Sequence, residues 1–127
     1  MTLSRRASRR TAFFLLYQWD VTGQPLASLY EGEVDEFARD TADAVAARVE
    51  ELDSRITAAS EGWTADRLGA VERNILRLAI YELDEGSVPL EVVIDEAVTL
   101  AKRYATEEAG RLVNGIPGRI AREKEVA

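Results

Sequence analysis

The residues best suited to chemistry in this 127-residue chain are four arginines near its N-terminus. They are Arg5, Arg6, Arg9 and Arg10, and no acidic residue precedes Asp20. An apolar and aromatic run over residues 12–17 follows them. Arginine binds phosphates through a planar fork of donors and stacks on bases, and aromatic rings form platforms for unpaired bases. These residue types together indicate an anionic partner, and single-stranded RNA fits them.

Groups suited to catalysis are scarce. The chain has neither histidine nor cysteine, so the usual general base, the thiol nucleophile and the soft metal ligands are missing. Neighbouring carboxylates such as Glu50 and Glu51 would point about 100° apart on a helix and are typical of solvated pairs. No glycine-rich phosphate loop follows a predicted strand. We therefore expect a protein that is not an enzyme and uses no cofactor and no metal.

The net charge of −7 conceals an uneven distribution along the chain. Residues 1–19 carry four basic groups and no acid, residues 20–98 carry six basic and nineteen acidic groups, and residues 99–127 carry six basic and four acidic groups. Such asymmetry favours an anionic partner at the basic ends and a cationic partner at the acidic middle. Acids that merely solvate exposed helix faces are the alternative explanation for the middle.

The basic N-terminus superficially resembles an export signal. Its apolar run stops at Gln18, which is too short for a signal sequence, and no small-residue cleavage pattern follows. No segment approaches the ~20 apolar residues of a membrane span. We expect this segment to belong to the fold of a cytoplasmic protein.

Helical periodicity positions these groups. It predicts helices over residues 4–20, 35–60 (one helix or two kinked ones), 68–83 and 89–104. A last helix is predicted from 107 onward, with Thr106 as its N-cap and an interruption at Pro117 and Gly118. Residues 68–83 are apolar around most of the circumference and should form the central buried helix. The weakly patterned residues 61–63 divide the chain into helical halves of about 1–61 and 62–127. The predicted class is all-α.

The first helix has two distinct sides. Its core side comprises Ser8, Ala12, Leu15, Leu16 and Trp19. The four arginines fall on the adjoining side, and helical phase places Phe13 and Tyr17 among them. Basic and aromatic groups would therefore share one surface, unless the two rings pack beneath a neighbouring element.

Several motifs resemble those of one known family. They are LYQW at 16–19 behind the arginines, VERNILRLAIYEL at 71–83, VP at 88–89, IDEAVTLAK at 94–102 and VNG at 113–115. In this order and spacing they resemble the bacterial transcription antitermination factor NusB nearly from end to end.

This resemblance implies a compact bundle of about six or seven helices in two packed subdomains and a function without catalysis. Such proteins bind boxA-type single-stranded RNA of rRNA operons as a heterodimer with the small-subunit ribosomal protein NusE. They act in the antitermination complex with RNA polymerase. A homodimer of the free protein is also possible.

The resemblance also implies site residues. The RNA surface would include Arg5, Arg6, Arg9, Lys102, Arg103, Tyr104, Arg111 and Asn114. The interface with the ribosomal protein would include Tyr17 and Glu72. Arg10 stands where relatives often have glutamate, which should strengthen phosphate attraction. Leu112 stands where relatives often have phenylalanine, which removes a possible stacking surface, and the pair Pro117-Gly118 also departs from the family pattern.

Two alternatives stay open. The chain could be a helical protein-interaction module with weak or lost RNA binding. It could also be a detached N-terminal module of an rRNA methyltransferase, although 127 residues leave no room for the cofactor-binding α/β domain of that enzyme.

Overall fold

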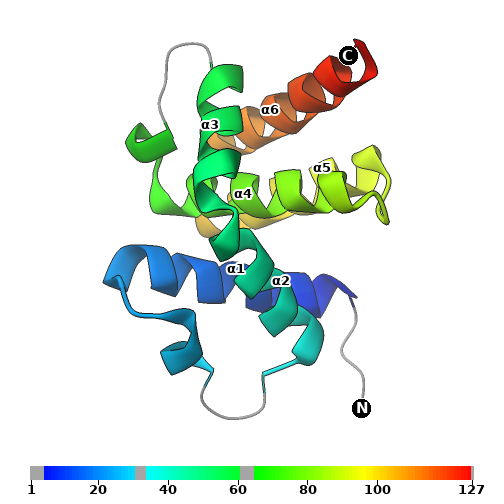
Figure 1. Ribbon diagram of the computed structural model, residues 1–127. Coiled ribbons are helices and arrows are strands. Elements are labelled where there is room, and N and C mark those ends of the chain that lie inside the picture. Colours follow the sequence, from blue (N-terminus) through cyan, green and yellow to red (C-terminus); the bar gives the residue numbers. More distant parts are fainter. Residues whose placement is uncertain (1–4, 31–33, 61–64, 127) are drawn as a thin grey trace. The chain divides into compact units, whose positions relative to one another are not determined.

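The computed structural model describes residues 5–30, 34–60 and 65–126. These residues form six α-helices and two short 3₁₀ turns, and no strand occurs within them (Figure 1). The predicted all-α class is therefore confirmed. In the described ranges no helix is long and apolar enough to cross a membrane. Contacts divide the chain into two units, Met1–Arg48 and Val49–Ala127, whereas the boundary expected near residues 61 and 62 lies outside the described residues.

The first unit contains α1 (Arg5–Thr22), a 3₁₀ turn (Leu26–Leu29) and α2 (Glu36–Ala47), and α1 packs on both others. α1 ends where Gly23 adopts a φ of 73°, a left-handed conformation that glycine adopts without steric cost. Asp35 caps the start of α2, because its carboxylate accepts a hydrogen bond from the Ala38 amide at 3.0 Å. The helix expected over residues 4–20 is thus present in α1.

A single residue, the last of the first unit, separates α2 from α3. The helical pattern over residues 35–60 left one long helix or two kinked ones open, and the structure has two. Arg48, with φ −110° and ψ 16°, follows α2, and α3 (Val49–Ala59) begins directly after it. The break lets the two halves of this pattern pack in separate units.

The second unit continues from α3 with a 3₁₀ turn (Ala65–Arg67), α4 (Ala70–Glu85), α5 (Leu90–Tyr104) and α6 (Glu107–Val126). α4 contacts α3, α5 and α6 and buries an unbroken run over residues 74–80. The central buried helix predicted from the sequence is therefore confirmed. α4 ends at Glu85, and Gly86 follows it with φ 73°.

Polar groups tie α3 to α4 inside the second unit. Arg77 donates from Nε and Nη2 to the two carboxylate oxygens of Asp53, both at 2.7 Å. Its Nη1 donates to Oδ1 of the fully buried Asn74 at 3.0 Å. A second ion pair joins Arg55 to Asp84 at 2.6 Å. The bidentate pair between Arg77 and Asp53 fixes the register of α3 against α4.

The interruption expected at Pro117 was wrong, because α6 runs through it without a break. A proline inside a helix costs about 3 kcal/mol. Pro117 itself is buried here, together with Val113, Ile116 and Ile120 on the same helix. Each buried aliphatic side chain contributes about 1.5–3 kcal/mol, so packing of α6 on α3, α4 and α5 outweighs the lost hydrogen bond.

Candidate nucleic-acid interface

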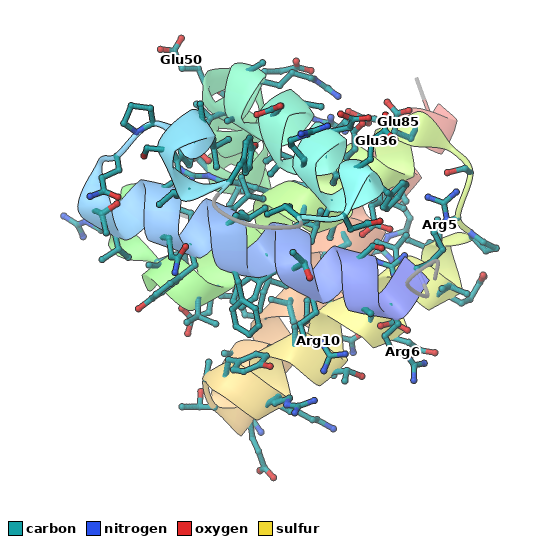
Figure 2. The ribbon with its side chains drawn as sticks, turned by 90° about the horizontal axis from the view of Figure 1, so that it is seen from below. Arg5, Arg6, Arg10, Glu36, Glu50 and Glu85 are labelled. Atoms are coloured by element: carbon teal, nitrogen blue, oxygen red, sulfur yellow. The ribbon has the colours of Figure 1, made fainter. Side chains whose placement is uncertain are left out.

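The four arginines of α1 do not form one exposed wall. Arg5 and Arg6 are exposed and Arg10 is half-buried, whereas Arg9 is only 8% exposed. Figure 2 shows Arg6 and Arg10 on one side of α1, with Arg5 turned toward the first turn of α2. Arg9 lies one turn before the buried Phe13 and continues the core stripe of α1, so little of it is accessible to a ligand.

The alternative that the rings of the first helix pack inward is confirmed for Phe13 and not for Tyr17. Phe13 is 2% exposed and belongs to the core, while Phe14 is 41% and Tyr17 36% exposed. The exposed row on α1 therefore consists of Arg6, Phe14 and Tyr17 together with the half-buried Arg10. These four residues follow one another at spacings of four, four and three. The sequence analysis did not include Phe14, because helical phase placed Phe13 beside the arginines and Phe14 lies about 100° further around the helix.

Arg5 is held by an aromatic ring. Its guanidinium carbon lies 3.9 Å from the centroid of the Phe37 ring on α2, within cation–π range. Both side chains remain exposed. Stacking on Phe37 orders an arginine that stands at the very start of α1.

In the second unit the basic groups gather where α5 ends and α6 begins. Lys102 and Arg103 are exposed in the last turn of α5, and Tyr104 is half-buried. The Arg103 guanidinium lies 5.6 Å from the Tyr104 ring centroid. A methyl group at Gly110 of α6 would lie only 3.5 Å from Lys102 Cγ, so the stem of the lysine packs across this glycine. Close packing of α5 against α6 thus fixes the position of the aliphatic part of the Lys102 side chain.

Arg111 and Asn114 extend this surface along α6. Both are exposed, and their spacing of three places them on one face. The helix start is fixed by Thr106, whose hydroxyl accepts a hydrogen bond from the Ala109 amide at 3.0 Å, as the sequence predicted for an N-cap.

A groove of about 540 Å³ lies in the second unit between the start of α4 and the start of α6. It is lined by Arg67, Leu68, Gly69, Glu72, Thr106, Ala109, Arg111 and Leu112. Arg111, expected to contact RNA, and Glu72, expected to contact a protein, therefore share one surface. Arg67 was not foreseen, because it stands alone in a weakly patterned segment.

The two residues expected at the protein interface lie in different units. Tyr17 is exposed on α1, and Glu72 is half-buried in the first turn of α4. A carboxylate in a first turn is favoured by the positive end of the helix dipole.

No group of three or more potential metal ligands occurs among the residues that the structure describes.

Known proteins match this chain over nearly its whole length. The NusB family model matches residues 6–122. The transcription antitermination protein NusB of Rubrobacter xylanophilus is 46% identical over 121 residues, which cover 90% of this chain and 87% of that protein. The corresponding protein of Aquifex aeolicus is 40% identical over 124 residues, covering 88% and 83% of the two chains.

Solved structures match equally well. NusB from T. maritima superposes with a TM-score of 0.85 at 38% identity, covering 97% of this chain and 94% of that one. A crystal structure of the antitermination factors NusB and NusE in complex with double-stranded RNA gives a TM-score of 0.83 at 35% identity, covering 94% and 96%. The sequence match and the fold agree, and this chain belongs to the NusB family.

Proposed function

We propose that this protein is a non-enzymatic transcription antitermination factor that binds boxA-type RNA of rRNA operons together with the ribosomal protein NusE. The observation that carries the proposal is the match over residues 6–122 to a family whose member has been crystallised with NusE and RNA. Because transcription in bacteria takes place in the cytoplasm, the proposal places the protein there.

The exposed row on α1 supports RNA contact from the first unit. Arg6 and Arg10 offer guanidinium groups to phosphates, and Phe14 offers a ring on which a base can stack. Arg5 adds a charge ordered by Phe37. Arg9 is better suited to supporting this helix from beneath than to touching RNA, because it is buried.

Basic groups of the second unit support the same role. Lys102, Arg103 and Arg111 are exposed cations, and the amide of Asn114 can donate to and accept from a base edge. The half-buried Tyr104 carries Arg103 over its ring. These five residues are the RNA contacts that we assign to the second unit.

Charge also supports a basic protein partner. The middle of the chain, residues 20–98, carries nineteen acidic groups against six basic ones. Opposite charge steers association and suppresses wrong partners. In this proposal Tyr17 supplies an exposed aromatic anchor and Glu72 a carboxylate for the ribosomal protein.

The test measures binding of a boxA-like RNA with and without NusE over a series of salt concentrations. The variant Arg6→Ala/Arg10→Ala should weaken binding by about tenfold or more and lessen its salt dependence. Arg39→Ala removes an exposed arginine from α2, outside the proposed surface, and is the matched control. Equal affinities of the two variants would contradict the proposed RNA surface.

The same RNA is offered as a single strand and as a duplex, because the NusB and NusE structure contains double-stranded RNA. Exposed aromatic rings favour the single strand, since a duplex hides its base faces. Undetectable binding at low salt, even with NusE, would favour the alternative of an interaction module that has lost RNA binding.

A further inference from the structure

Gly69 occupies a position where nothing in the backbone requires glycine. It precedes the first residue of α4 with φ −61° and ψ 152°, an extended conformation open to any residue. It is also exposed, so the packing of a core does not exclude a side chain. Serine, threonine, asparagine or aspartate would cap the helix at this position, and Gly69 provides no such bond.

The side chain of Glu72 explains why position 69 has a glycine. The three atoms that an added Cβ would meet first all belong to Glu72. Oε2 would lie well inside van der Waals contact, Cδ at 3.2 Å and Oε1 at 3.5 Å. The Glu72 side chain therefore folds back toward the helix start and fills the space that a side chain at position 69 would take.

This arrangement belongs to the groove between α4 and α6. Gly69 and Glu72 both line it, as do Arg67 and Arg111. The direction of the Glu72 side chain thus decides where this groove, which two arginines also line, presents a negative charge.

We propose that Gly69 is a positioning residue for partner binding, which by lacking a side chain keeps the Glu72 carboxylate at its place in the groove. The inference rests on the proposed function, in which Glu72 contacts the ribosomal protein. A methyl group at position 69 meets only the far end of a flexible side chain in its three nearest atoms. The carboxylate swings away at little cost, so the fold survives while the charge is displaced.

The experiment measures the dissociation constant of the full chain for NusE by calorimetry, and the melting temperature of each variant. Gly69→Ala should weaken binding by about three- to tenfold, and Glu72→Ala should weaken it at least as much. The double variant Gly69→Ala/Glu72→Ala should bind as Glu72→Ala does, because no carboxylate is left to displace. Gly115→Ala is the matched control, since its added methyl group meets nothing within 4 Å.

Gly69→Ser separates positioning from stability. A serine at the helix start should raise the melting temperature through its cap, yet its Cβ displaces the carboxylate and the affinity should fall. If Gly69 served only the stability of the fold, Gly69→Ser would lower the melting temperature and the affinity together.

Each other outcome decides the matter. If Glu72→Ala weakens binding and Gly69→Ala does not, the inference is wrong and the proposed interface stands. If Gly69→Ala costs the same affinity with and without Glu72, its effect does not run through the carboxylate and the inference is again wrong. If Glu72→Ala leaves binding unchanged, both the interface role of Glu72 and the inference fail.

Discussion

Asp53→Ala is expected to destabilise the second unit by about 3 kcal/mol. The substitution removes both short hydrogen bonds that Arg77 makes through Nε and Nη2. The Arg77 side chain is only 6% exposed, so its charge stays in the interior without the paired carboxylate. Breaking a buried pair from one side costs about 3–5 kcal/mol. The lower end applies because the Asp53 side chain is 29% exposed and water replaces part of the lost bonding.

Urea denaturation followed by far-ultraviolet circular dichroism measures this effect. Glu50→Ala is the matched control, because it removes the same charge from the same helix, where Figure 2 shows the side chain extending outward. The control should change stability by no more than about 0.5 kcal/mol. Adding Arg77→Met to Asp53→Ala should restore part of the loss, since the uncompensated charge is then gone. Equal stabilities of Asp53→Ala and Glu50→Ala would refute the reasoning.

Three further predictions concern local features. Thr106→Ala should lower the free energy of unfolding by about 1 kcal/mol, measured in urea, because it removes the N-cap bond of α6. Gly115→Ala should raise it by about 0.5–1 kcal/mol, because the site is an exposed helix interior with open space for the methyl group. Burial, together with the 2.6 Å bond to Asp43, raises the pKa of Tyr30, so the tyrosinate absorbance that Tyr30→Phe removes should appear at higher pH in the folded protein than in the unfolded chain. The unfolded chain releases that proton near pH 10 while the folded one retains it, so the stability from Tyr30 should be complete below about pH 10 and decline above it.

The sequence predicted best those elements that local signals determine. Thr106 caps α6, and the apolar residues over 74–80 made α4 the buried helix. Helical phase placed Phe13 beside the arginines, whereas Phe13 is buried and its neighbour Phe14 is exposed. Periodicity alone does not decide which of two adjacent aromatic residues, about 100° apart around the helix, faces the core. Pro117 was misjudged because tertiary packing overrides helix propensity.

Other features depend on pairs of residues far apart in the sequence. Asp53 and Arg77 meet across two helices, and no local pattern in either segment announces the pair. The groove likewise joins Glu72 to Arg111 from different helices. Arg9 is buried because it lies in line with the core residues of α1. The distribution of charge along the chain does not reveal this burial.

The burial of Arg9 has a consequence for how RNA binding would respond to ionic strength. Each phosphate that a protein neutralises releases condensed counterions, and for single strands each such contact contributes about −0.7 to the slope of log affinity against log salt. The sequence offers four arginines at the start of α1, but the one that is 8% exposed is poorly placed to displace ions from RNA. The slope should therefore follow the exposed guanidinium groups of this protein and be shallower than its arginine content suggests.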